Sequence, residues 1–148
     1  MELNPFNDDY FMKEALKEAH KAYSIDEVPV GAIIVAKNKI IARAHNLTQR
    51  LNDATAHAEM QALTSASNYL GSRYLNDCVL YVTLEPCVMC CGGAYWSQLG
   101  KIVYGASDRK SRFPHLKNKI TLSKTEIISG ILEKDCEKIL NDFFQNKR

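Results

Sequence analysis

The feature that most constrains the fold is an alternation of short apolar runs with helical segments. Residues 78–83, CVLYVT, form a β-branched and aromatic run that is typical of a buried strand. A helix is predicted from about Cys87 to Leu99, ended by Gly100, and residues 101–106 predict the next strand. Strands that alternate with helices favour right-handed crossovers and a sheet covered on both faces. The expected fold class is therefore α/β.

The rest of the chain continues this pattern. Asn7 or Asp8 can cap a first helix, Asn38 suits the tight turn of a hairpin, and Gly71 is a suitable helix stop. The predicted elements are helices at 7–24, 56–71 and about 132–143, with strands at 32–36, 40–46 and 125–130. Each group of candidate functional residues then falls at a strand-to-helix turn, where open α/β sheets place their sites.

Length and composition indicate one globular domain over residues 1–148. Hydrophobic residues make up 46% of the chain and charged residues 24%, which is ordinary for a globular protein. No apolar run is long enough to cross a bilayer, so no membrane partner is expected. The first ten residues, MELNPFNDDY, lack the basic-then-apolar pattern of a secretion signal, and a cytoplasmic location is the default expectation.

Three cysteines lie within five positions of the stretch EPCVMCCGG, residues 85–93. The chain has five cysteines, an odd number, which argues against a disulfide framework. Cys87 and Cys90 have the C-x2-C spacing, which is compatible with a redox pair, with half of a structural zinc site, or with part of a catalytic zinc site. Pro86 presets the entry to the helix, whose start favours thiolates in all three cases.

The sequence TAHAEMQAL supplies the feature that separates these alternatives. His57 and Glu59 sit at the start of a different helix, and together with the two thiols they resemble a soft ligand set beside a carboxylate. Residues i and i+2 do not share a helix face, so Glu59 is expected to reach a water rather than to bind the metal beside His57. The other cysteines and histidines point elsewhere or lack partners at ligand spacing: Cys78, Cys91, Cys136, His20, His45 and His115. Three ligands and an open position argue for a catalytic zinc with a bound water.

His57-x-Glu59 followed by Pro86-Cys87-x2-Cys90 is the signature of the zinc deaminases. Within that superfamily the chain resembles the bacterial tRNA adenosine deaminases, which convert the wobble adenosine to inosine. The resemblance covers nearly the whole chain. It is strongest in the stretches EVPVGAIIV, NDATAHAEMQAL, LYVTLEPCVMC and KIVYGASD.

The resemblance implies a fold, a cofactor and a substrate. It implies a three-layer α/β/α cytidine-deaminase-like fold with a central mixed sheet of about five strands, and a homodimer that binds one Zn²⁺ per subunit. The tRNA anticodon loop would be the partner, at a site that includes residues of both subunits. The implied roles are metal binding by His57, Cys87 and Cys90, proton transfer by Glu59, base contacts from Asn46 and the Ala58 backbone, and pocket walls from Val30 and Leu84.

The segment SDRKSRFPHLKNK, residues 107–119, is shorter than its counterpart in the resembled family. Asp108 and Lys110 still match, and the cations that follow have no acidic residue among them up to Lys124. Such a cluster can follow phosphates. By helical period one of Phe143 and Phe144 faces the core, leaving the other free to touch RNA. The candidate RNA contacts are Asp108, Arg109, Lys110, Arg112, Phe144, Lys147 and Arg148.

Other functions stay open at this point. Residues 94–96, AYW, resemble the corresponding helix of bacterial guanine deaminases, which keeps a free-base deaminase of the guanine or cytosine type as the alternative. Trp96 is expected in the core or at a dimer interface. A zinc-stabilised RNA-binding module and a redox protein are the non-deaminase alternatives.

Overall fold

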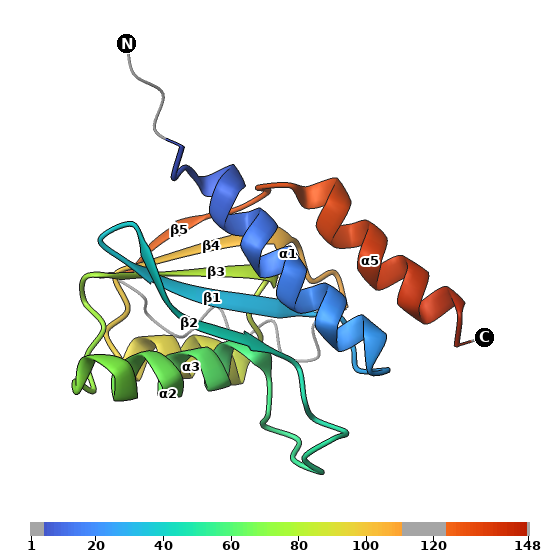
Figure 1. Cartoon of the computed structure of the whole chain (residues 1–148), viewed down its shortest axis with the longest axis horizontal. Coiled ribbons are helices and arrows are strands. Elements are labelled where there is room, and N and C mark those ends of the chain that lie inside the picture. The colour runs from blue at the N-terminus through green and yellow to red at the C-terminus, as the bar shows by residue number, and fades with distance from the viewer. Residues whose placement is uncertain (1–4, 111–123, 148) are drawn as a thin grey trace.

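The computed structural model describes residues 5–110 and 124–147, and Figure 1 shows them around a single sheet. The strands, in the order in which they lie side by side, are β2 (Lys39–His45), β1 (Gly31–Ala36), β3 (Cys78–Leu84), β4 (Lys101–Ala106) and β5 (Glu126–Ile128). β1 is antiparallel to both β2 and β3, whereas β3, β4 and β5 run parallel. The predicted mixed sheet of about five strands is confirmed.

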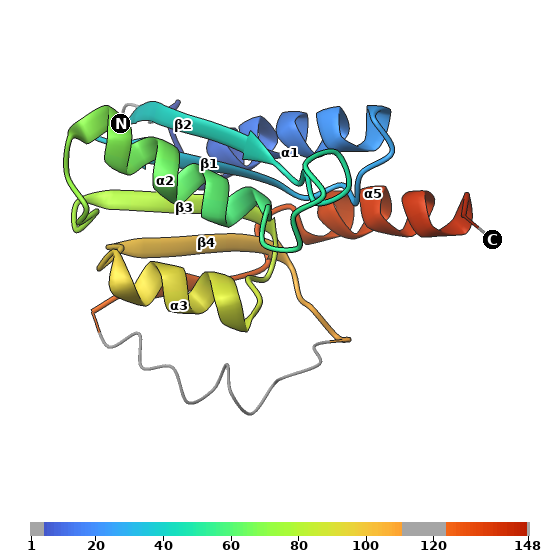
Figure 2. The same ribbon diagram turned by 90° about the horizontal axis from the view of Figure 1, so that it is seen from below.

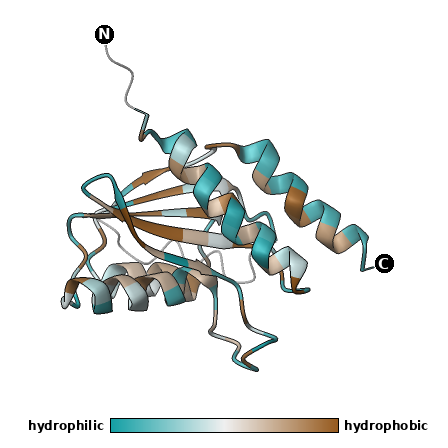
Figure 3. Ribbon diagram, in the orientation of Figure 1, coloured by the Kyte–Doolittle hydropathy of each residue, from teal (hydrophilic) through white to brown (hydrophobic). Residues whose placement is uncertain are grey.

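Helices cover both faces of this sheet. α1 (Asp8–Ser24) and α5 (Glu133–Gln145) lie on one face, and α2 (Ala58–Leu70) and α3 (Val88–Trp96) lie on the other (Figures 1 and 2). The α/β fold with three layers, α/β/α, is therefore also confirmed. The strands are largely hydrophobic, as expected for a sheet buried on both sides (Figure 3). Among the described helices, none combines the length and the apolar character needed to cross a membrane.

Two hydrophobic clusters fill the spaces between the layers. Successive residues of β1 point to opposite faces, so Ile33 packs with Phe11 and Met12 of α1, while Ile34 packs with Ala62 of α2. Both isoleucines are completely buried. A six-residue strand thereby anchors the helices of both outer layers.

Several local predictions hold in detail. Asn7 caps α1 by accepting a hydrogen bond from the Tyr10 N–H at 2.9 Å. Lys37 and Asn38 both have positive φ, at 50° and 63°, as the tight turn between β1 and β2 requires. Gly71 ends α2 in the left-handed conformation. These features depend on neighbouring residues alone, which is why sequence pattern finds them.

The predicted end of α3 and the predicted burial of Trp96 are only partly right. The helix ends at Trp96 rather than Leu99, because Gln98 adopts a left-handed backbone (φ 55°) and the Ser97 hydroxyl bonds the Gly93 carbonyl at 2.9 Å. That turn directs Leu99 fully into the core. Trp96 itself is 78% exposed, so the core alternative for this side chain is wrong.

The thiols outside the C-x2-C pair are packed, as predicted. Cys78 and Cys136 are buried in opposite hydrophobic clusters, and Cys136 lies against Gly105 of β4. Burial raises the pKa of both thiols, to about 12 for Cys136, so both stay protonated at neutral pH. Neither residue is available as a metal ligand.

Charged residues tie α1 to the edge strand β2. Arg43 of β2 bonds Glu14 at 2.5 Å, and Lys17 bonds the same carboxylate at 2.6 Å. The hydrogen bonds from Lys17 and then Arg43 hold the pKa of Glu14 below its ordinary value of 4.5. His45, at the end of β2, lies 3.3 Å from Glu18 of α1.

Candidate active site

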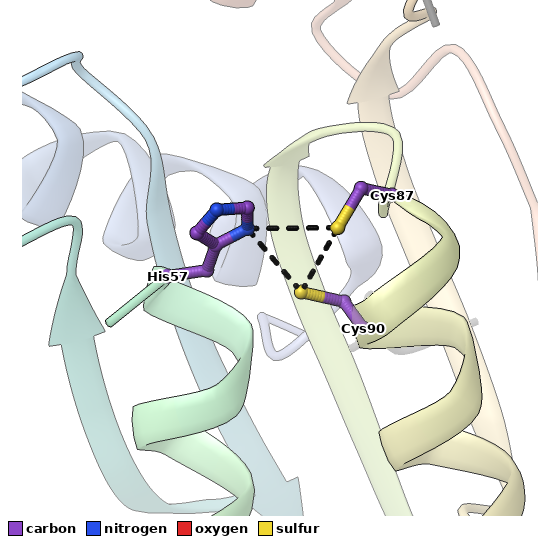
Figure 4. Close-up of side chains that lie close together, drawn as sticks. All are labelled: His57, Cys87 and Cys90. Atoms are coloured by element: carbon purple, nitrogen blue, oxygen red, sulfur yellow. Dashed lines mark hydrogen bonds between the residues drawn. The ribbon is translucent and has the colours of Figure 1, made fainter. Parts of the chain in front are cut away.

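The three predicted metal ligands converge at one end of the sheet, from the starts of two helices. His57 is the N-cap of α2, Cys87 is the N-cap of α3, and Cys90 lies in the first turn of α3. Both N-cap residues have extended backbone, which turns their side chains from the preceding loop toward the helix start. Neither side chain caps its own helix, so both are free to face the space between α2 and α3 (Figure 4).

The ligand atoms form a nearly regular triangle. The Nδ1 of His57 lies 3.6 Å from the sulfur of Cys87 and 3.6 Å from that of Cys90, and the two sulfurs are 3.7 Å apart. Tetrahedral zinc, with bonds of about 2.3 Å to sulfur and about 2.0 Å to nitrogen, separates two sulfurs by about 3.8 Å and sulfur from nitrogen by about 3.5 Å. The side chains therefore fit zinc without rearrangement. Within residues 5–110 and 124–147, no other three His, Cys, Asp or Glu side chains converge in this way.

The protonation of the metal-free triad follows from its hydrogen bonds. The hydrogen bond between Cys87 and Cys90, and then that between Cys87 and His57, lower the pKa of Cys87 to about 4. The hydrogen bond with Cys87 and burial raise the pKa of Cys90, and the hydrogen bond with Cys87 raises the pKa of His57. One thiolate is thus present before any metal arrives, and metal binding would release the proton of Cys90.

Glu59 lies in the first turn of α2, beside the triad. Its residue is only 4% exposed, and burial raises the pKa of its carboxyl to about 7 in the metal-free protein. A carboxyl in this position can hold or release a proton next to the metal ligands. That is consistent with the expectation that Glu59 transfers protons rather than binds metal, and the role stays a prediction.

A pocket of about 260 Å³ opens beside the triad. Every residue that the sequence predicts to touch the base lines it, and so does Asp108 from the end of β4. Asn46, after β2, is itself buried. The complete lining is Val28, Val30, Asn46, Thr48, His57, Ala58, Glu59, Leu84, Glu85, Cys87 and Asp108.

Sequence reasoning missed Val28, Thr48 and Glu85. The available signal was position, since each residue stands within two of a predicted pocket residue that lies just before, just after or at the end of a strand. Glu85 accepts a hydrogen bond from the backbone N–H of Asp108 at 2.9 Å, which links the ends of the parallel strands β3 and β4 at the pocket.

Glu27 is a second omission. The residue is completely buried, and its two carboxylate oxygens accept the backbone N–H groups of Gln49 and Arg50 at 3.0 and 2.9 Å. These bonds hold the loop that carries Thr48 against the segment that carries Val28. A charged residue before the apolar run VPVGAIIVA was the available signal.

Only some of the predicted RNA contacts lie within the described residues. Arg109 and Lys110 are exposed next to the pocket residue Asp108, whose side chain accepts the Lys110 backbone N–H at 3.1 Å. Arg112 and Arg148 lie outside the described residues.

The C-terminal helix gives a mixed result. Phe143 is buried and Phe144 is 49% exposed, as the helical period predicts. Lys147 forms an ion pair with Asp26 and lies over the Phe143 ring at 5.3 Å from its centre. The charge of Lys147 is therefore already engaged within the protein.

The stretch that opened the metal question, EPCVMCCGG, also contains Cys91 and two glycines. Cys91 is buried, its thiol donates to the Pro86 carbonyl at 3.6 Å, and it is not part of the convergent ligand group. A Cβ on Gly93 would come within 2.9 Å of the Met60 sulfur, so this glycine permits close packing of α3 on α2. A Cβ on Gly92 would meet nothing within 4 Å, so helix packing does not require a glycine at that position.

Comparison with known proteins identifies relatives over most of the chain. Residues 5–106 match the family described as the cytidine and deoxycytidylate deaminase zinc-binding region. A tRNA-specific adenosine deaminase of Bacillus subtilis is 42% identical over 154 residues, covering 95% of this chain and 91% of that protein.

Solved deaminase structures are also similar to this chain. One, from work on A-to-I editing by tRNA:A34 deaminases at the wobble position, superimposes with a TM-score of 0.81 at 38% identity, covering 88% of this chain and 99% of the other. A guanine deaminase from Bacillus subtilis is 39% identical with a TM-score of 0.65, over 68% of this chain and 65% of that one. The family match over residues 5–106 contains the whole His57–Cys87–Cys90 triad. The chain therefore belongs to the cytidine and deoxycytidylate deaminase family of zinc-binding proteins.

Proposed function

We propose that this protein is a zinc-dependent hydrolase that converts the wobble adenosine of tRNA to inosine and releases ammonia. The observation that carries the proposal is the metal-ligand triad at the wall of a pocket that also contains Glu59 and Asn46. Its substrate is inferred from relatives at about 40% identity that are named tRNA-specific adenosine deaminases. The cytoplasm is the corresponding location, since that is where tRNA is decoded.

His57, Cys87 and Cys90 would hold one Zn²⁺ per subunit. When bound, zinc lowers the pKa of a water toward neutrality and so supplies a hydroxide equivalent. The Glu59 carboxylate lies beside the ligands, where it would accept a proton from the attacking water and deliver it to the ring nitrogen of adenine. In the net reaction water adds at C6, the C6–N bond breaks, and the amino group leaves as ammonia.

The other pocket residues would hold the base. The Asn46 side chain can both donate and accept a hydrogen bond, which suits the edge of a purine. The Ala58 backbone lies between His57 and Glu59 and can bond the same base. Val30 and Leu84 supply apolar walls. Burial of Asn46 fixes its position, since little of this residue contacts solvent.

The anticodon loop would lie across the rim formed by Asp108, Arg109 and Lys110. The two cations are exposed and can contact phosphates on either side of the flipped nucleotide. Arg112, Phe144 and Arg148 remain candidate contacts. Lys147 is a weaker candidate, because Asp26 already pairs with its ammonium group.

The decisive experiment measures inosine at position 34 after zinc-loaded protein is incubated with a tRNA whose anticodon begins with adenosine. Glu59→Gln should fold and bind zinc, while its turnover falls by roughly 10²- to 10⁴-fold because the proton acceptor is gone. Glu126→Gln, on the exposed edge strand β5, is the matched control and should keep full turnover. Retained turnover in Glu59→Gln would refute the role of this residue and would favour a zinc-stabilised RNA-binding module.

A free-base deaminase is the second candidate function, favoured by the 39% identity to a guanine deaminase. The same zinc-loaded protein is offered guanine, cytosine and the corresponding nucleosides without tRNA. Ammonia release from one of these compounds, with no inosine formed in tRNA, would select this alternative. A reversible Cys87–Cys90 disulfide in protein that purifies without metal would instead select a redox function.

We also propose that the protein is a homodimer whose interface includes the end of α3. Tyr95 and Trp96 are adjacent, stacked edge to face, and 51% and 78% exposed. Large aromatic side chains exposed together on one helix commonly mark an interaction surface. Light scattering should give a dimer for the wild type and a monomer for Trp96→Glu. A monomeric wild type would contradict the proposal.

A further inference from the structure

One polar side chain of α2 bridges the two ends of the loop that leads from β2 to the metal site. The Gln61 side-chain nitrogen lies 2.8 Å from the His45 carbonyl oxygen and 3.0 Å from that of Ala56. The His57 carbonyl oxygen is a third, longer neighbour at 3.5 Å. An amide NH₂ has two hydrogens, so the two short contacts account for both. Three surrounding oxygens also require this end of the amide to be the NH₂ group.

The two carbonyl groups belong to residues that precede functional side chains. His45 is followed directly by Asn46, which lines the pocket, and Ala56 is followed by His57, which is a metal ligand. The Ala56 carbonyl also accepts the Leu47 N–H at 3.1 Å, which closes the base of the loop. Gln61 therefore joins the strand end that carries Asn46 to the helix start that carries His57, independently of the loop between them.

We infer that Gln61 is a positioning residue that sets the location of Asn46 relative to the metal ligands. Among the described hydrogen bonds, the Asn46 side chain makes none to α2, and the His57 side chain makes none to the end of β2. The side-chain bonds from Gln61 to the His45 and Ala56 carbonyl groups supply that connection, together with the backbone bond from Leu47 to Ala56. The inference rests on the proposed role of Asn46 in binding the substrate base.

Two substitutions test this role in different ways. Gln61→Glu keeps the shape of the side chain but places a carboxylate against three carbonyl oxygens, so it forces the two segments apart. Gln61→Met keeps the length and removes both hydrogen bonds without adding charge. Thr64→Val is the control, because it removes a side-chain bond to the Met60 carbonyl on the exposed part of the same helix.

We expect Gln61→Glu to bind one zinc per subunit and to lower kcat/KM by roughly 10- to 100-fold, the effect of a misplacement of about 1 Å. Gln61→Met should show a smaller loss, and Thr64→Val none. Each variant is also made in the Asn46→Ala background. Because Gln61 acts through Asn46, its substitution should change kcat/KM much less there.

Equal losses in both backgrounds, or wild-type kcat/KM in both Gln61 variants, would overturn the inference. The cycle is measured with tRNA and with the free bases. If only a free base is deaminated, the proposed substrate is wrong, but the dependence of Gln61 on Asn46 is still measured with that base. The two failures are therefore distinguishable.

Discussion

Gly31 is the position where one methyl group should most disturb the fold. It begins β1, directly beneath α1, and a Cβ added there would lie 2.1 Å from the Ala15 carbonyl oxygen and 2.4 Å from the Ala19 nitrogen. Real Cβ atoms essentially never come closer than 3.0 Å to such atoms. Both obstacles are backbone atoms of a helix, which cannot rotate away as a side chain can. In Gly31→Ala the helix α1 must therefore move as a unit, by roughly 1 Å.

The free energy of unfolding should fall accordingly. Overpacking a core typically costs about 1–3 kcal/mol, and the rigid obstacle places Gly31→Ala near the upper end, at about 3 kcal/mol. For a chain of this length that corresponds to a decrease of roughly 6–12 °C in the melting temperature. The buried face of α1, which includes Phe11 and Met12, would lose its fit to the sheet at the same time.

The chain supplies matched controls for this prediction. A Cβ at Gly92, inside α3, would meet nothing within 4 Å, so Gly92→Ala should stabilise by up to about 1 kcal/mol through helix propensity. At Gly93 the obstacle is the flexible Met60 side chain at 2.9 Å, and an intermediate effect is expected.

Urea unfolding of the zinc-loaded proteins, followed by circular dichroism, gives the three free energies with a common extrapolation. The expected order of stability is Gly92→Ala, then Gly93→Ala, then Gly31→Ala. If Gly31→Ala lies within 0.5 kcal/mol of Gly92→Ala, roughly the error of such measurements, the argument from backbone contact is refuted.

Three further predictions concern single side chains. Cys91→Ala should keep its zinc and its turnover, while its free energy of unfolding falls by about 1 kcal/mol. Cys87→Ala should lose both zinc and turnover. Metal analysis and the inosine assay test both variants. The folded-state pKa of Glu14 is lowered, so its carboxylate stabilises the fold above the ordinary pKa of 4.5, and this contribution is lost as the pH falls through the folded pKa. Glu14→Gln should accordingly be less stable than wild type at neutral pH and equally stable in acid, and a constant difference in unfolding free energy would contradict this. In tRNA binding at varied salt, Arg109→Ala should reduce the slope of log K against log salt by about 1, and Lys147→Ala by less; equal slopes would remove the distinction between these cations.

Local pattern was sufficient for most of the secondary structure. Helical period and cap residues identified α1, the Asn38 turn identified the hairpin, and Gly71 marked the end of α2. The end of α3 was missed because Leu99 is buried by packing between the layers. The residues next to Leu99 in the sequence carry no signal of that packing. The core alternative for Trp96 was wrong for the same reason, since helical period does not say which faces of α3 the rest of the fold covers.

The chemistry of the site was already present in the sequence, because residue type and spacing decide it. A histidine, two thiols and a carboxylate at helix starts predict a zinc site whichever way the chain folds. Whether they meet depends on the sheet, whose strand ends bring His57 within 3.6 Å of thiols that are 30 and 33 residues away.

Other features depended entirely on tertiary structure. Glu27 and Gln61 bond the backbone of distant segments, and backbone groups are the same at every residue, so such partners leave no pattern in the sequence. Likewise only the packing distinguishes Gly31, which touches α1, from Gly92, which touches nothing. The sequence determined which side chains are candidates for the chemistry, and the tertiary structure decided their distances, because those distances are set by contacts between segments far apart along the chain.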